Sequence, residues 1–282
     1  MLQDIAPHHL FNQMQFVEPE AHDAVLCYRD SSASHRHEAV LVRRDGAGFR
    51  FPTYEELGWC GKVVFALSVD ETRFFLLLDA APETAPDGFF YLRVYSARVE
   101  LAKPWNMAMA TGYHLHLWYR DNRFCGRCGV PLVHSTWERA LECPSCGNTV
   151  YPKIAPAIIV AVTWGDRILL ARYAKSVSQS RALVAGFVEI GETAEETVAR
   201  EVYEECGVRV KDIRYYKSQP WGIASDLLLG YTAHLDGDPT ITLQEDELGY
   251  AEWVRREDIS EEPDEVSLTR ELICAFKDGR IQ

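Results

Sequence analysis

The chain has 282 residues, enough for one large domain or for two smaller domains with an insert. Hydrophobic residues make up 47% and charged residues 25%, a composition that excludes a disordered chain. The 29 Lys and Arg against 42 Asp and Glu give a net charge of −13, which disfavours general coating of nucleic acid. An anionic substrate therefore needs a bound cation or a local group of basic residues.

No segment of the sequence is apolar enough to cross a membrane. The longest apolar run covers residues 154–162 and contains Pro156, whereas a transmembrane helix needs roughly 20 residues. The first residues, MLQDIAP, lack the basic and apolar regions of a secretory signal. We therefore expect no membrane partner and a cytoplasmic location.

Residues 1–121 are expected to form a β-rich domain that ends in a connecting helix. Four apolar runs separated by Gly, Pro and Asp turns have the composition of strands; they cover residues 24–28, 39–42, 63–67 and 74–78. Residues 105–119 carry Met, Ala, Leu and aromatic side chains with Gly112 as the one breaker, which predicts the helix.

Residues 122–152 contain two closely spaced pairs of cysteines, Cys125 with Cys128 and Cys143 with Cys146. Four thiolates on two short turns can surround one Zn²⁺ ion tetrahedrally. A redox pair or a chance cluster is disfavoured because both pairs have the spacing of a zinc ribbon. Four protein ligands leave no position for water, so the predicted zinc ion is structural.

Residues 153–282 are expected to form a second domain in which strands and helices alternate. A hairpin is predicted at 157–163 and 167–172, further strands at 182–187, 215–218 and 227–234, and helices at 194–206 and 268–276. This order indicates a mixed α/β or α+β sandwich.

The helix at 194–206 carries a cluster of glutamates. Thr193 and Glu196 form a capping box that predicts its start, and Gly207 predicts its end. At 100° per residue, Glu201, Glu204 and Glu205 share one face. The opposite arc is expected to face the core and holds Val198, Ala199, Val202, Tyr203 and Cys206.

Carboxylates one turn apart repel each other by roughly a few tenths of a kcal/mol per pair. A divalent cation such as Mg²⁺ or Mn²⁺ removes that repulsion and can also bridge phosphate oxygens. Arg200, one turn before Glu204, is placed to orient that carboxylate. The glutamates alone fit a solvated acidic face equally well. The preceding loop favours a site, because Gly186 and Gly191 leave bare backbone beside the carboxylates.

The segment 186–208 matches the pattern G-x5-E-x7-R-E-U-x-E-E-x-G-U at every fixed position and therefore resembles the Nudix box. The fixed positions are Gly186, Glu192, Arg200, Glu201, Glu204, Glu205 and Gly207. With the upstream cysteines and the sequence SQPW at 218–221, the chain resembles the NADH pyrophosphatase family. The resemblance implies an α+β fold: a Nudix α/β/α sandwich, preceded by a four-Cys zinc ribbon and a β-rich N-terminal domain.

The resemblance also implies roles for individual residues. Glu201 and Glu205 are implied as metal ligands, Glu204 as an auxiliary ligand or general base, and Arg200 as part of the catalytic group. Further implied metal ligands are Glu247, with Glu245 as the alternative, and the backbone carbonyl of Ala185. The implied substrate contacts are Tyr151, Phe187, Glu192, Gln219, Pro220, Trp221, Gly222, Asp226, Arg93 and Thr269.

This chain departs from the family pattern at two places. Members usually continue after the Trp as P-F-P-x-S, but here the sequence is GIASD at 222–226. Thr269 stands where members usually have Ala. Both changes alter the expected contacts to the nucleotide.

The implied reaction is metal-dependent hydrolysis of the diphosphate of NADH or NAD⁺ to nicotinamide mononucleotide and AMP, by a homodimer. The same chemistry would remove an NAD cap from the 5′ end of an RNA. One alternative is a broader pyrophosphatase acting on ADP-ribose or dinucleoside polyphosphates. Another is a zinc-ribbon nucleic-acid-binding module with a silent Nudix domain, against which the complete glutamate set argues.

Overall fold

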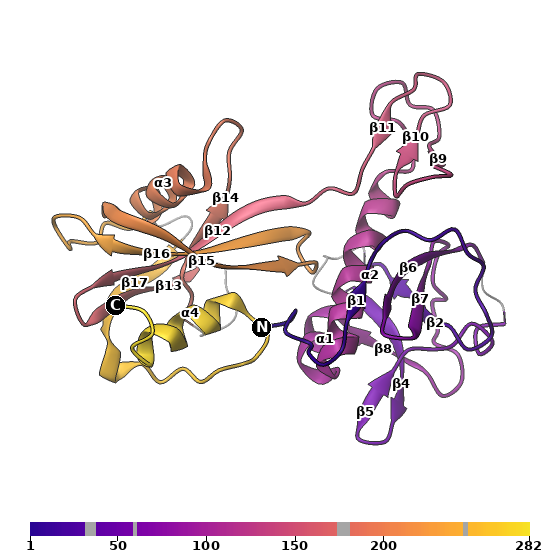
Figure 1. Cartoon of the computed structure of the whole chain (residues 1–282), viewed down its shortest axis with the longest axis horizontal. Coiled ribbons are helices and arrows are strands. Elements are labelled where there is room, and N and C mark those ends of the chain that lie inside the picture. Colours follow the sequence, from indigo (N-terminus) through magenta and orange to yellow (C-terminus); the bar gives the residue numbers. More distant parts are fainter. Residues whose placement is uncertain (32–37, 59–60, 174–180, 245–247) are drawn as a thin grey trace. The chain divides into compact units, whose positions relative to one another are not determined.

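A computed structural model describes residues 1–31, 38–58, 61–173, 181–244 and 248–282 (Figure 1). The chain divides into two compact units. One unit comprises Ile154–Trp221 and Asp226–Gln282 with Met1–Leu2, and the other comprises Gln3–Lys153 with Gly222–Ser225. Within the described ranges, none of the helices combines the length and apolar character that a bilayer span requires.

The unit that contains Gln3–Lys153 begins with two small β-sheets. Its strands are β1 (Leu10–Phe11), β2 (Ala24–Leu26), β3 (Tyr28–Arg29), β4 (Ala39–Asp45), β5 (Gly48–Arg50), β6 (Val63–Val69), β7 (Thr72–Leu77) and β8 (Phe90–Arg93). One sheet has the order β1-β6-β7-β2; in the other, β4 pairs with β3, β5 and β8. The four apolar runs predicted as strands are confirmed by β2, β4, β6 and β7.

Two helices follow these sheets, α1 (Val94–Glu100) and α2 (Lys103–Asp121). The predicted helix at 105–119 is confirmed by α2, whereas α1 was not predicted. Gly112 does not break α2. It lies where the helix packs closely against β2, and a Cβ at this position would overlap the side chain of Leu26. The helix then leads into a three-stranded antiparallel sheet of β9 (Val133–His134), β10 (Leu141–Glu142) and β11 (Thr149–Val150).

The other unit is built on one mixed sheet. Its strands are β12 (Ala155–Trp164), β13 (Arg167–Tyr173), β14 (Val184–Phe187), β15 (Val210–Trp221), β16 (Asp226–Leu235) and β17 (Leu248–Arg255). Their order is β15-β16-β12-β13-β17, and β14 pairs with β12. The central strand β12 runs parallel to β16 from Ala155 to Thr163, and this non-local pairing joins the two halves of the sheet.

A helix covers each face of this sheet. Helix α3 (Ala194–Cys206) packs on the face that carries Ile158 and Val160, whereas α4 (Leu268–Lys277) packs on the face that carries Ile159 and Ala161. Because both faces of β12 are buried along its middle, its sequence from Ala157 to Val162 is apolar and does not alternate. The 3₁₀ helix η2 (Arg256–Asp258) follows β17. The predicted α+β fold with an α/β/α sandwich is confirmed.

The predicted boundaries of α3 are confirmed, but its predicted core face is partly wrong. Tyr203 is 54% exposed and Ala199 is also exposed, whereas Glu205 is only 2% exposed. The buried arc is centred close to Glu201 and not opposite to it, so the side of α3 that faces the sheet includes Glu205. The apolar residues that are buried as predicted are Val198, Val202 and Cys206.

Candidate active site

The two ends of α3 are fixed by local hydrogen bonds. The Glu196 backbone N–H donates to Thr193 Oγ1 at 3.2 Å, and the Thr193 backbone N–H donates to Glu196 Oε2 at 2.8 Å, which completes the capping box. At the other end, Gly207 adopts a left-handed conformation with φ of 71°. The glutamates between these ends therefore project from a helix of fixed length and rotation.

The Arg200 guanidinium lies at the centre of the carboxylate cluster. Its Nε and Nη2 donate to the two oxygens of Glu192 at 2.7 and 2.9 Å. Its Nη1 donates to Glu201 Oε1 at 2.8 Å and to Glu204 Oε2 at 3.0 Å. Nη2 also donates to the Phe187 carbonyl oxygen at 3.1 Å, which ties α3 to the end of β14. A single planar cation thus orients three carboxylates.

Electrostatics within this cluster keep Glu192 ionised. The hydrogen bond from Arg200 lowers the pKa of Glu192 to about 2. In return, Glu192 raises the pKa of Arg200 above its ordinary value. Both groups therefore carry full charge at neutral pH.

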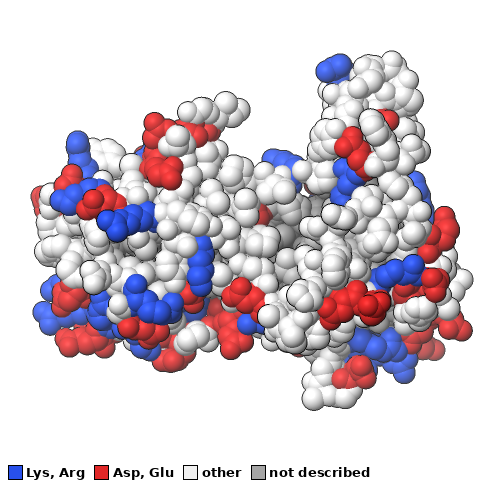
Figure 2. Space-filling view, in the orientation of Figure 1, with Lys and Arg blue, Asp and Glu red and all other residues white. Residues whose placement is uncertain are grey.

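The three glutamates of α3 differ in exposure. Glu205 is 2% exposed, the side chain of Glu201 is 12% exposed and that of Glu204 is 50% exposed. The Glu201 carboxylate lies directly against the backbone of Gly186 in β14, where a Cβ would overlap it. Figure 2 shows acidic side chains gathered over the region of α3 and its preceding loop. The site thus offers carboxylate oxygens that range from buried to exposed, next to the backbone of Gly186.

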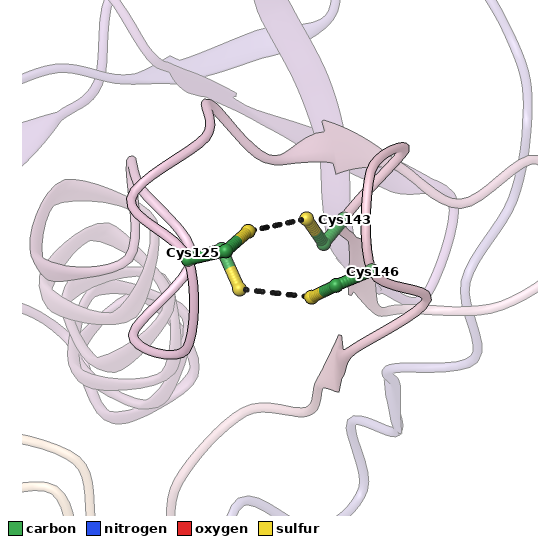
Figure 3. A group of neighbouring side chains, drawn as sticks. Cys125, Cys143 and Cys146 are labelled. Carbon is green, nitrogen blue, oxygen red and sulfur yellow. Dashed lines mark hydrogen bonds between the residues drawn. The ribbon is translucent and has the colours of Figure 1, made fainter.

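The four cysteines of the ribbon come together as predicted (Figure 3). Their sulfurs lie within 4.8 Å of one another. Cys125 Sγ is 3.7 Å from Cys146 Sγ, and Cys128 Sγ is 3.4 Å from Cys143 Sγ. Four sulfurs about 2.3 Å from a central zinc ion would be about 3.8 Å apart in a tetrahedron, so the arrangement fits structural zinc.

Equivalent turns present the two pairs of cysteines. The Gly129 N–H donates to the Cys125 carbonyl at 2.8 Å, and the Gly147 N–H donates to the Cys143 carbonyl at 3.0 Å. Both glycines have positive φ, 74° and 69°. The backbone N–H of Arg127 donates to Cys125 Sγ at 3.4 Å and lowers the pKa of that thiol.

Comparison with known proteins places these two sites in one family. Residues 120–151 match the NADH pyrophosphatase zinc ribbon domain, and residues 153–276 match the NUDIX domain. The chain is 35% identical over 242 residues to "NAD-capped RNA hydrolase NudC" of Pseudomonas aeruginosa (strain LESB58), covering 86% of this chain and 79% of that protein. The chain belongs to the NADH pyrophosphatase family of Nudix hydrolases.

The chain is also similar to two further proteins. The protein of the same name from Klebsiella pneumoniae subsp. pneumoniae is 43% identical over 163 residues, which cover 57% of this chain and 63% of that protein. A crystal structure of a NUDIX hydrolase from Nitrosomonas europaea aligns with a TM-score of 0.48 and 20% identity, over 56% of this chain and 92% of that chain.

The SQPW motif of the family lies at the end of β15. Gln219 is fully buried: its Nε2 donates to the Val266 carbonyl at 2.7 Å, and its Oε1 accepts from the Leu268 N–H at 2.8 Å. This side chain anchors the start of α4, and its contact with substrate stays a prediction. Trp221 pairs with Asp226 at the turn end of the β15–β16 hairpin.

The remaining predicted site residues are distributed over both units. Phe187, at the end of β14, is 57% exposed, Pro220 is exposed, and Thr269 lies in the first turn of α4. Tyr151, Arg93 and Gly222 belong to the unit that contains the zinc ribbon. The Tyr151 hydroxyl donates to Glu138 at 3.0 Å. Glu245 and Glu247 lie outside the described residues.

Sequence reasoning missed a residue that supports the cluster. Thr197 is fully buried and its Oγ1 donates to Glu192 Oε2 at 2.9 Å. The Thr197 hydroxyl thus adds a hydrogen bond to the Glu192 carboxylate, which Arg200 also binds. The signal that was available is the position of Thr197 four residues before Glu201, on the same side of the helix.

Proposed function

We propose that this protein hydrolyses the diphosphate bond of NADH or NAD⁺ to nicotinamide mononucleotide and AMP, and removes NAD caps from the 5′ end of RNA. The observation that carries this proposal is the carboxylate cluster that Arg200 organises against β14. The name of the similar Pseudomonas aeruginosa protein, a hydrolase of NAD-capped RNA, supports the second substrate.

The donor set fits a hard divalent cation. Glu201, Glu204 and Glu205, with the backbone carbonyl of Ala185 and with Glu247, are the proposed ligands of Mg²⁺ or Mn²⁺, which prefer carboxylate and carbonyl oxygens. When bound, such an ion would neutralise the diphosphate oxygens and polarise the phosphorus toward attack. The zinc ion of the ribbon cannot take this catalytic role, because four thiolates fill its coordination.

The residues of the chain divide the remaining work. Glu204 is the most exposed of the three glutamates, and we assign to it the acceptance of a proton from the attacking water. Arg200 holds Glu204 in place by a hydrogen bond, and Glu192 balances the positive charge of Arg200. The guanidinium therefore acts by positioning the Glu204 carboxylate. The exposed ring of Phe187 offers a stacking surface for a base of the dinucleotide.

The family resemblance supports the remaining proposed contacts to the substrate. They are Tyr151, Glu192, Gln219, Pro220, Trp221, Gly222, Asp226, Arg93 and Thr269. Since GIASD replaces the usual family sequence after the Trp, these contacts also decide how strongly NADH is preferred over ADP-ribose.

Chromatography of products after incubation with NADH and Mn²⁺ tests the reaction, and AMP with nicotinamide mononucleotide are the expected products. Glu204→Gln should reduce kcat by about 10²-fold or more with an unchanged Tm. Glu257→Gln, which changes an exposed glutamate after β17, is the matched control and should retain full activity. Equal kcat/KM for NADH, NAD⁺ and ADP-ribose would refute the preference for NAD(H).

We also infer a homodimer and a cytoplasmic location. The family resemblance implies the dimer, and light scattering after size-exclusion chromatography measures it directly. The ribbon needs its cysteines as thiolates, which a reducing compartment preserves.

A further inference from the structure

A recess on the outer side of α3 is lined by Arg200 and by residues that the proposed reaction does not use. It has a volume of about 510 Å³, within the range of roughly 300–1,000 Å³ that small-molecule sites occupy. Helix α3 forms one wall, and the residues at the start of β15 with the residue that follows β16 form the other. The lining residues are Ala199, Arg200, Tyr203, Arg209, Val210 and Asp236.

The chain reversal after α3 creates this recess. The left-handed Gly207 ends the helix and turns the chain, so that Arg209 returns beside Tyr203. The Asp236 N–H donates to the Arg209 carbonyl at 2.8 Å, which fixes the far wall. Ala199 lies one turn before Tyr203, and its small side chain leaves the floor of the recess open.

The chemistry of the lining suits a ligand with a flat ring and a negative charge. Tyr203 is 54% exposed, and the Arg209 guanidinium carbon lies 5.8 Å from the centre of its ring. Within the described ranges, no carboxylate lies within ion-pair distance of Arg209. The charge of Asp236 is offset by Lys211 at 3.0 Å. An exposed aromatic beside an available cation is the combination that binds single-stranded nucleic acid.

The recess also adjoins the catalytic group. Arg200 lines it on one side and holds Glu201 and Glu204 on the other. A ligand in the recess therefore lies one side chain away from the carboxylates.

The structure assigns this recess to one nucleotide of an RNA chain. This is the nucleotide that follows the AMP half of the NAD cap. The Tyr203 ring stacks on its base, and Arg209 pairs with a phosphate oxygen. This assignment rests on the proposed function, because it takes the capped RNA as substrate. Free NAD⁺ has no nucleotide beyond its AMP half, so it does not reach the recess.

The test compares kcat/KM for NAD-capped RNA and for free NAD⁺ in the same variants. Tyr203→Ala should lower kcat/KM for the capped RNA by about tenfold, the usual effect of losing one stacked base, and leave that for NAD⁺ unchanged. Tyr203→Phe keeps the ring and should behave as the parent. Ala199→Leu fills the recess and should reproduce the loss, since leucine is also a good helix former.

Arg209→Gln should weaken the binding of the capped RNA. It should also lower the slope of log affinity against log salt concentration by about one. Trp164→Ala is the control, because it removes a 41% exposed aromatic at the end of β12. It should leave kcat/KM for both substrates unchanged. Equal effects of Tyr203→Ala on both substrates, or no effect on either, would overturn the assignment and leave the surface to a protein partner or to solvent.

Failure of the proposed function gives a different result. If the parent protein cleaves neither substrate, the catalytic proposal is wrong. Fluorescence anisotropy with a 3′-labelled single-stranded RNA decamer then still tests the recess. Weaker binding by Tyr203→Ala, with binding by Tyr203→Phe retained, would support it, whereas equal binding by all three proteins would refute it.

Discussion

Replacing Gly186 by alanine should separate catalysis from stability. A Cβ at this position would lie within 2.5 Å of three carboxyl atoms of Glu201. Ordinary contacts between heavy atoms need about 3.5 Å, so the carboxylate would have to retreat by about 1 Å or more. A displacement of this size in a catalytic group costs about 10²-fold in rate.

The same substitution should cost little stability. The overlapping atoms are the end of a flexible side chain, and Gly186 does not adopt a positive φ, so alanine is compatible with its backbone. Loss of about 1 kcal/mol would lower the Tm by about 2–4 °C. Gly48→Ala is the control, since its nearest neighbour would lie 3.8 Å from the new Cβ.

The assay measures kcat/KM for NADH over a range of Mn²⁺ concentrations, together with thermal unfolding. We expect Gly186→Ala to lose about 10²-fold in kcat/KM and to need more Mn²⁺, with a nearly parental Tm. Parental activity in this variant would refute the placement of Glu201 against β14. A large loss of Tm would show that Gly186 serves the fold and not the site.

Three further changes probe the zinc site, the acidic cluster and a buried ion pair. Cys143→Ser should lose bound zinc and lower the Tm of the unit that holds the ribbon, as measured by metal analysis and calorimetry; full zinc content would contradict the four-thiolate site. The pKa of Glu192 is lowered to about 2 by Arg200, so its contribution to stability is complete above pH 4.5 and disappears as the pH falls toward 2. Glu192→Gln should therefore shift the urea midpoint at pH 7 more than at pH 3, and equal shifts would argue against the ion pair. Arg120→Ala removes a 2.8 Å partner of the Glu38 carboxylate, which is 2% exposed, and should cost about 3 kcal/mol in urea unfolding; a loss below about 1 kcal/mol would show that other groups suffice.

The features that sequence predicts best are those that depend on near neighbours. The ends of α3 follow from Thr193, Glu196 and Gly207, whose capping interactions span at most four residues. The zinc ribbon follows from the spacing of its cysteines, because the two turns are local and the ion determines how they meet. These contacts do not depend on the rest of the fold.

The features that sequence misses depend on distant partners. Strand β15 runs over twelve residues, yet only Tyr215–Ser218 was predicted, because its length comes from pairing with β16 and not from apolar residues. The burial of Glu205 arises from the sheet beneath α3 and has no signal in the helix itself. Glu38 meets Tyr113 and Arg120 across 75 and 82 residues, a distance that no local pattern spans.

The charge of the site explains why an acidic protein can act on an anionic substrate. The acidic side chains of the site, Glu192, Glu201, Glu204 and Glu205 with the proposed ligand Glu247, outnumber the single guanidinium of Arg200. Since Arg200 is held by three of these carboxylates, it has little capacity left for a phosphate. A diphosphate is therefore repelled by this cluster unless divalent cations offset its negative charge. It follows that Arg200 positions carboxylates, and that divalent cations held by these carboxylates would supply the positive charge that a diphosphate needs.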